Sequence, residues 1–265
     1  MKAFKLLLVL LLWHTSSSAA PTHADYFEAC GVQGSTTLYD YKHKHWHFTD
    51  RTDAYQASLP ASTFKIINSL IALDTGAIKN THEIIKWDGK DNKLFGQSIP
   101  AWNRDQDLVS AYKNSTIWFY VELAKRIGRK NYQRYLDQAD YGNGNLSEEG
   151  TDFWNYGEFG IAPIDQVHFL IRLYENTLPF SQAAMDSVKD IMVSENTQGI
   201  TYRDKTGWTQ KNGRDIGWWV GYAQAQNNVY FFATRITKDV HTKNANFAAC
   251  RKTITKHVLE SLMHP

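Results

Sequence analysis

The feature that most constrains the fold is a change in the spacing of apolar residues near residue 197. Before this point, apolar side chains recur at helical intervals. After it, the chain has segments rich in strand-forming residues that are joined by short polar turns. The predicted strands are 200–205, 216–223 and 229–236, followed by an amphipathic helix over 246–263.

The beginning of the chain also contains predicted strands, at 36–41 and 46–49, after a short helix over 25–32. The middle of the chain is predicted to be mainly helical, with residues 91–108 as a loop that includes a short helix. The predicted helices of this middle region are 62–74, 116–127, 130–136, 163–174 and 183–193.

This distribution predicts an α/β fold in which both chain ends contribute to one antiparallel sheet. Terminal helices are expected to flank the sheet, and the mainly helical region is an insert between its two halves. We expect residues 20–265 to form a single unit. Its α/β part is predicted at about 20–60 and 197–265, and its helical part at about 61–196.

The composition indicates a globular protein, because 43% of the 265 residues are hydrophobic and 9 are tryptophan. Basic and acidic residues nearly balance, at 29 and 27, and the formal net charge is +2. No basic stripe stands out, so the sequence offers no argument for a nucleic-acid partner.

The first residues have the pattern of an export signal. Lys2 and Lys5 precede an apolar stretch over 6–13 that is too short to span a bilayer, and small residues follow it. Cleavage is expected after Ala19, which gives a signal peptide over 1–19. We expect export to the periplasm of a Gram-negative bacterium and no membrane association after cleavage.

Export leaves open the state of the two cysteines, Cys30 and Cys250. They can form a disulfide if the chain ends meet, or they can be two buried free thiols.

Three histidines, His43, His45 and His47, have a spacing that resembles a metal-ligand pattern. A turn at this place is expected to splay their side chains, and no acidic or cysteine partner is adjacent. A solvated hairpin is therefore predicted rather than a metal site.

Ser62 and Lys65 are the first candidates for chemistry. They lie three residues apart at the start of a predicted helix, so both side chains can share one face. A hydroxyl becomes a useful nucleophile when a neighbouring base takes its proton. The pair therefore predicts an acylation site, with a helix start and a snorkelling lysine as the structural alternative.

Two further motifs can complete such a site. Lys205, Thr206 and Gly207 lie on a predicted edge strand, where a cation, a hydroxyl and a glycine can bind an anion at close approach. Ser115 is predicted to open a helix and can relay a proton. Ser110 begins a similar tripeptide, Ser110-Ala111-Tyr112, but Ser115 is preferred because it keeps register with the helix that follows.

Together, these motifs resemble the penicillin-recognising serine acyltransferases, and within them the class D β-lactamases. The resemblance extends over the mature chain from about residue 25, and Tyr141-Gly142-Asn143 is its class-distinguishing element. The other matching stretches are Pro60–Lys65, Lys86–Gly89, Ser115–Ile117, Lys205–Trp208 and Gly217–Gly221.

Three residues depart from the family pattern, at two places. Ile117 replaces the usual valine and keeps an apolar β-branched wall. Asn155 and Tyr156 follow Trp154 where many members have an aliphatic residue and then an acid, which affects the shape and wetness of the site rim.

The resemblance implies that Ser62 attacks a β-lactam carbonyl and that Lys65 is carboxylated by carbon dioxide to become the general base. Relatives with asparagine at position 117 often use a separate glutamate, and none is evident here. Apolar surroundings lower a lysine pKa and so favour the neutral amine. Phe64 and Ile117 are expected to supply those surroundings, and Trp154 an indole N–H donor for the carbamate. No metal and no other cofactor is implied.

Substrate binding is also implied by the resemblance. Ser115 is expected to pass a proton to the lactam nitrogen, and Lys205 to supply positive potential beside it. Thr206 and Arg251 are expected to bind the substrate carboxylate, although Arg251 can also be an ordinary surface arginine. Gly207 is expected to let the substrate approach the strand closely. The backbone N–H groups of Ser62 and Trp208 are expected to form the oxyanion hole.

Four other residues are expected to be structural. They are Tyr141 and Asn143, in a turn near the site, and Trp102 and Trp218, in packing.

The resulting hypothesis is an exported β-lactam hydrolase that confers resistance, acting on a small-molecule substrate as a monomer or homodimer. Two alternatives remain: a β-lactam-binding sensor domain, and a peptidoglycan transpeptidase or carboxypeptidase. Sensor domains are normally fused to membrane helices, and transpeptidases typically have asparagine in the second motif and a membrane anchor.

Overall fold

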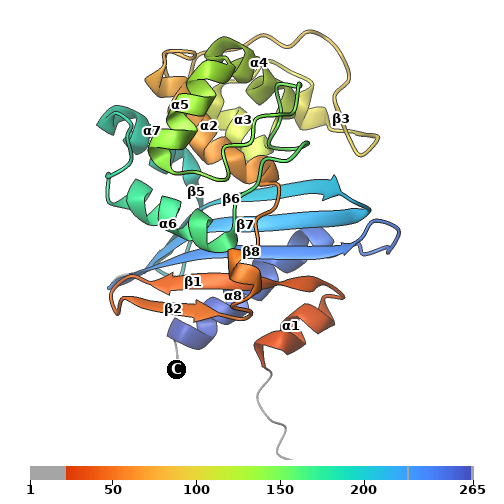
Figure 1. Ribbon diagram of the computed structural model, residues 1–265, viewed down its shortest axis with the longest axis vertical. Coiled ribbons are helices and arrows are strands. Elements are labelled where there is room, and N and C mark those ends of the chain that lie inside the picture. Colours follow the sequence, from red (N-terminus) through yellow and green to blue (C-terminus); the bar gives the residue numbers. More distant parts are fainter. Residues whose placement is uncertain (1–21, 226, 264–265) are drawn as a thin grey trace, which may run out of the picture.

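Six antiparallel strands form the central sheet, in the order β2-β1-β8-β7-β6-β5 (Figure 1). The structure is a computed structural model that describes residues 22–225 and 227–263, so the predicted signal peptide over 1–19 lies outside the described residues. Both chain ends contribute strands, as the sequence predicts. The strands are β1 (Gln33–Asp40), β2 (His45–Phe48), β5 (Val193–Thr197), β6 (Ile200–Lys211), β7 (Arg214–Ala225) and β8 (Asn228–Asp239).

The central strand β7 is covered on both faces, because its side chains alternate between two hydrophobic clusters. Trp218, Val220 and Tyr222 pack with the helices of the insert. Trp219 and Ala223 face the opposite side, where α8 (Phe247–Met263) packs. This alternation follows from the two-residue period of a strand.

The three long strands extend further than predicted at their polar ends. Asn212 and Gly213 form the turn between β6 and β7 with φ of 52° and 73°, and Lys211 pairs with Arg214 across it. An Asn-Gly pair favours this two-residue hairpin, because both residues tolerate positive φ. The Asn212-Gly213 pair therefore marks where β6 ends and β7 begins. The alternation of apolar residues alone does not show these ends.

The two terminal helices lie together on one face of the sheet and are joined covalently. Cys30 follows α1 (His23–Ala29), Cys250 lies in α8, and their Cα atoms are 6.0 Å apart in a disulfide. Of the two alternatives left open by the sequence, the structure contains the bridge.

The other helices lie mainly at the opposite face of the sheet, in the upper part of Figure 1. The helix predicted over 163–174 is present with these bounds and begins with Pro163, which suits the first helical turn. These helices are α2 (Lys65–Asp74), α3 (Leu108–Asn114), α4 (Ile117–Ile127), α5 (Arg129–Ala139), α6 (Pro163–Tyr174) and α7 (Gln182–Met192).

Helix α3 and strand β5 were not predicted. Helix α3 is only seven residues long, and a capping box between Asp107 and Ser110 starts it. Strand β5 follows α7 directly and is largely polar, so it lacks an apolar period. The loop 91–108 contains a small hairpin of β3 (Lys93–Leu94) and β4 (Gln97–Ser98), and a 3₁₀ turn over Pro100–Trp102.

The described residues contain no helix that is both long enough and apolar enough to cross a membrane. Within 22–225 and 227–263, histidine, cysteine, aspartate and glutamate form no group of three or more that could hold a metal ion. His45 and His47 lie on β2, and the ring of His43 contacts the carboxylate of Asp40 at 2.8 Å in the adjoining turn.

Candidate active site

Ser62 lies in a short 3₁₀ turn, Ala61–Phe64, directly before α2. The sequence predicted one continuous helix over 62–74, and this prediction is wrong for the first turn. The backbone of Ala61 has a φ of 52°, which is uncommon for a residue with a side chain. The Ala61 N–H donates to the carbonyl of Trp154 at 3.0 Å. The loop that carries Trp154 therefore holds the strained residue beside Ser62 in place.

Lys65 Nζ donates to Ser62 Oγ at 2.9 Å, and the Lys65 side chain is fully buried. Burial lowers the pKa of Lys65 well below its ordinary value, and the charge of Lys205 lowers it further. Asp152 opposes these effects more weakly. The amine of Lys65 is thus suited to be neutral beside the nucleophile.

Aromatic rings enclose this lysine. The ring of Phe64 stacks on that of Trp154 with centroids 5.1 Å apart, and the Tyr120 ring centroid lies 5.0 Å from Lys65 Nζ. The Trp154 indole N–H is buried and has no hydrogen-bond partner among the described residues. A buried donor of this kind is costly unless it binds something.

Ser115 lines the cavity and accepts a hydrogen bond from Lys205 Nζ, and the Lys205 side chain is buried behind it. The prediction that Ser115 opens a helix is wrong. It ends α3 in a left-handed conformation, with φ of 55°, and α4 begins two residues later. The earlier serine, Ser110, belongs instead to the capping box of α3 and does not line the site.

Strand β6 brings its Lys205–Trp208 segment close to the nucleophile turn. A Cβ atom on Gly207 would lie 2.8 Å from the carbonyl oxygen of Pro60, so only glycine permits this approach. The prediction of an edge strand is partly wrong, because β5 pairs with the beginning of β6. This pairing ends at Arg203, which leaves the later residues with a strand partner on one side only.

Arg251 reaches the site from α8 and is not an ordinary surface arginine. Its Nη1 donates to the carbonyl of Gly207, whereas its Nε is buried without a partner in the described part of the chain. Burial lowers the pKa of Arg251 to about 10, which leaves the guanidinium charged at neutral pH, and Asp204 opposes this shift.

One cavity of about 200 Å³ lies between the helical insert and the sheet, and Phe64, Lys65, Trp154 and Lys205 are not among the residues that line it. Ser62, Ser115 and Arg251 approach it from three different parts of the fold. The complete lining is Ser62, Leu94, Ile99, Trp102, Asn114, Ser115, Ile117, Thr206, Gly207, Trp208 and Arg251.

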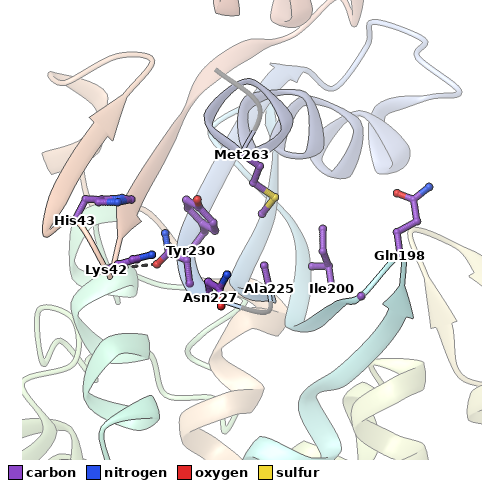
Figure 2. Close-up of a pocket in the computed structure, with 10 residues that line it drawn as sticks. Lys42, His43, Gln198, Ile200, Ala225, Asn227, Tyr230 and Met263 are labelled. Carbon is purple, nitrogen blue, oxygen red and sulfur yellow. Dashed lines mark hydrogen bonds between the residues drawn. The ribbon is translucent and has the colours of Figure 1, made fainter.

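A second cavity, of about 500 Å³, lies at the turns that join β5 to β6 and β7 to β8 (Figure 2). Tyr230 and Met263 line it, together with Lys42 and His43 from the turn after β1. None of the residues assigned to catalysis or substrate binding from the sequence lines this cavity.

Comparison with known proteins identifies the family. Residues 31–260 match the family described as penicillin binding protein transpeptidase domain. The chain is 39% identical over 229 residues to β-lactamase OXA-48 of Klebsiella pneumoniae, which covers 86% of this chain and 83% of that protein. The solved structure of the class D β-lactamase YbXI from Nostoc superposes with a TM-score of 0.84 at 40% identity, and covers 91% of this chain and 98% of that one.

The chain belongs to the class D β-lactamase family. A regulatory protein, BlaR1 of Bacillus licheniformis, is also similar, at 32% identity over 215 residues. That match covers 81% of this chain but only 35% of BlaR1.

The structure places the three residues that were expected to depart from the family pattern. Ile117 lines the cavity as an apolar wall. Asn155 is buried, and its amide nitrogen has no hydrogen-bond partner within the described residues, whereas the next side chain, Tyr156, is exposed. A polar group therefore replaces an aliphatic one next to Trp154.

The structural role predicted for the Tyr141–Asn143 turn agrees with its contacts. Asn143 Nδ2 donates to the Glu158 carbonyl at 2.9 Å, and the buried Tyr141 hydroxyl donates to Gln166. Trp218 is fully buried, as predicted. Trp102 was assigned to packing rather than to the cleft; it is buried, and it also lines the cavity.

Sequence reasoning missed the part of the lining that comes from the loop 91–108 and the end of α3. Leu94, Ile99 and Asn114 contribute there. The aromatic and aliphatic residues scattered through this polar loop were the only local signal, and they are a weak one, because single apolar residues are common on protein surfaces.

Proposed function

We propose that this class D β-lactamase hydrolyses the amide bond of penicillin-type β-lactams through an acyl-serine intermediate on Ser62, and so confers resistance to these antibiotics. The observation that carries the proposal is the 2.9 Å hydrogen bond between Lys65 Nζ and Ser62 Oγ, at a fully buried lysine whose pKa is lowered by burial. This arrangement combines a nucleophile with an adjacent base.

The fully buried Lys65 and the unpartnered Trp154 N–H suit a carbamate formed from carbon dioxide, a group that carries oxygen acceptors. Trp154 is the donor that would hold it, with Phe64 and Ile117 as apolar neighbours. When present, the carbamate supplies the general base for serine and for water.

Acylation begins with attack of Ser62 Oγ on the lactam carbonyl. The backbone N–H groups of Ser62 and Trp208 are the proposed oxyanion donors, and each such donor is typically worth about 3 kcal/mol in the transition state. Ser115 delivers a proton to the lactam nitrogen as its bond to the carbonyl carbon breaks. Lys205 donates to Ser115 Oγ, which favours this direction of transfer.

The substrate carboxylate is proposed to bind Thr206 and Arg251, with Lys205 adding positive potential. Thr206 on β6 and Arg251 on α8 both line the cavity. The surroundings of Lys205 are cationic. The basic groups Arg251, Lys252 and Lys113 act on it, whereas Asp204 is the acidic group that acts on it. An anionic β-lactam is thereby drawn to Thr206 and Arg251.

We further propose export through the signal peptide over 1–19 to the periplasm, followed by action as a monomer or homodimer. The α/β part at about 20–60 and 197–265 and the helical part at about 61–196 are proposed to act as one catalytic unit, with the cavity between them.

Incubation of the purified protein with a penicillin tests the function. Many equivalents of hydrolysed product are expected, with no product from Ser62→Ala. Ser69→Ala is a matched control, because Ser69 is also buried on α2 but its hydroxyl donates to the Lys65 carbonyl. Turnover limited to one equivalent would overturn the proposal.

A sensor domain is the second candidate, and the similarity to BlaR1 over 81% of the chain favours it. Mass spectrometry separates the two functions. A long-lived acyl adduct on Ser62 without release of product would assign the chain as a sensor.

A further inference from the structure

Trp208 lines the cavity, and its indole ring is held by residues outside the cavity. The ring contacts Phe247 of α8 and Phe95 of the β3–β4 turn, with centroids 5.1 Å and 5.2 Å away. Its N–H donates to Asp215 Oδ1 at 2.8 Å. An indole has only one hydrogen-bond donor, so a buried acceptor selects one orientation of the ring.

Asp215 is built into the sheet as a buried acceptor. It lies on β7 directly opposite Gln210 of β6 and Lys238 of β8. Gln210 Nε2 donates to the same oxygen as Trp208, at 3.0 Å, and Lys238 forms an ion pair with the other oxygen. Both members of this ion pair are buried.

The charge of Asp215 strengthens its hold on the indole. Burial raises the pKa of Asp215, but the hydrogen bonds from Lys238, Gln210 and Trp208 outweigh this effect and keep the pKa below its usual value. The carboxylate is therefore ionised at neutral pH, and hydrogen bonds to an ionised acceptor are stronger than neutral ones.

We propose that Asp215 is a positioning residue that fixes the Trp208 indole as a wall of the active-site cavity and thereby sets the affinity for the β-lactam. Asp215 does not line the cavity, so it acts through Trp208. That the ligand is a β-lactam rests on the proposed function. A purely structural alternative is that Asp215 only neutralises the buried charge of Lys238.

Two double variants separate these roles. Both Asp215→Asn/Lys238→Met and Asp215→Leu/Lys238→Met remove the ion pair without leaving a buried charge. Only the asparagine variant keeps an oxygen acceptor for Trp208. We expect KM for a penicillin to stay near the wild-type value in the asparagine variant and to rise about fivefold in the leucine variant, the effect of one hydrogen bond. The value of kcat should change less than twofold in both.

The indole N–H itself gives a readout that does not depend on turnover. Its cross-peak in a ¹H–¹⁵N spectrum is assigned by its loss in Trp208→Phe. The peak is expected to move slightly upfield in the asparagine variant, which keeps a weaker neutral acceptor, and much further upfield in the leucine variant. Because this measurement needs no substrate, it decides whether Asp215 orients the ring even if the wild type fails to hydrolyse penicillin.

A Trp208→Phe background provides a further test, because phenylalanine keeps an aromatic ring but has no N–H. The leucine substitutions should add nothing to KM in this background. Equal KM values in the two double variants, or an unmoved indole cross-peak in the leucine variant, would overturn the proposal and leave Asp215 as the counter-charge of Lys238.

Discussion

Lys205 Nζ on β6 donates to Ser115 Oγ in the turn between α3 and α4, so one hydrogen bond joins residues 90 positions apart across the cavity. One partner belongs to the sheet and the other to the helical insert. The geometry of the site therefore depends on how the insert packs on the sheet. The same hydrogen bond places Lys205, whose pKa is lowered by burial, next to Ser115, the proposed proton relay.

Replacement of Ser115 by alanine should lower kcat at least about 100-fold, because a positioned proton donor typically contributes this much. Ser110→Ala is the matched control, five residues earlier. It should leave kcat unchanged and lower the free energy of unfolding by about 1 kcal/mol, because Ser110 Oγ accepts from the Asp107 N–H in the α3 capping box. Steady-state kinetics and thermal unfolding measure the two effects. Equal losses of kcat in both variants would reject the relay.

Trp154→Phe should lower the occupancy of a carbamate on Lys65, because phenylalanine keeps the ring but removes the unpartnered donor. Occupancy is measured by ¹³C NMR after addition of labelled bicarbonate, and activity should recover as bicarbonate is raised. Trp219→Phe is the control, because its indole N–H is also buried and unpartnered in the described residues but faces α8. A carbamate signal unchanged by Trp154→Phe would contradict the assignment.

Activity should fall as the pH is lowered, because only the neutral amine of Lys65 reacts with carbon dioxide. Burial first, and then the charge of Lys205, lowers the pKa of Lys65, so the neutral form persists to lower pH than for an ordinary lysine. Added bicarbonate should restore part of the lost rate. A rate that does not respond to bicarbonate in carbon-dioxide-depleted buffer would count against carboxylation.

The affinity for an anionic penicillin should weaken above about pH 7. Burial lowers the pKa of Lys205 to about 7; Asp204 opposes the shift, and the charges of Arg251, Lys252 and Lys113 add to it. Above this pKa the amine is neutral and no longer attracts the substrate carboxylate, so KM should rise by up to about tenfold per pH unit. Lys205→Arg, which stays charged, should flatten the profile. A wild-type KM that is constant from about pH 6 to 9 would refute the expectation.

Loss of the disulfide should lower stability without loss of chemistry. Cys30→Ala removes the link between α1 and α8, which spans 220 residues of sequence, and should lower the free energy of unfolding by about 4–5 kcal/mol. Cys30 does not line the cavity, so kcat should be retained below the melting temperature. A reducing agent should lower the Tm of the wild type and leave that of Cys30→Ala unchanged; equal shifts would argue against the bridge.

The sequence predicted those helices and strands whose apolar residues recur at a regular interval. The helix over 163–174 has both an apolar period and Pro163 at its start, and its bounds agree with the structure. Helix α3 was missed because it is seven residues long and is defined by a capping contact. The polar strand β5 has no apolar period, and it forms because β6 offers a partner.

The sequence by itself determined the chemical groups, the family and the local pair of Ser62 and Lys65. That pair lies within one helical turn, so a spacing of three residues is enough to bring the two side chains together. Only the tertiary structure decided which groups surround it. The approach of Gly207 to Pro60, the arrival of Arg251 from α8 and the orientation of Trp208 by Asp215 all join distant segments. The burial that lowers the pKa of Lys65 likewise comes from packed neighbours, because desolvation depends on the folded surroundings of a side chain rather than on its position in the chain.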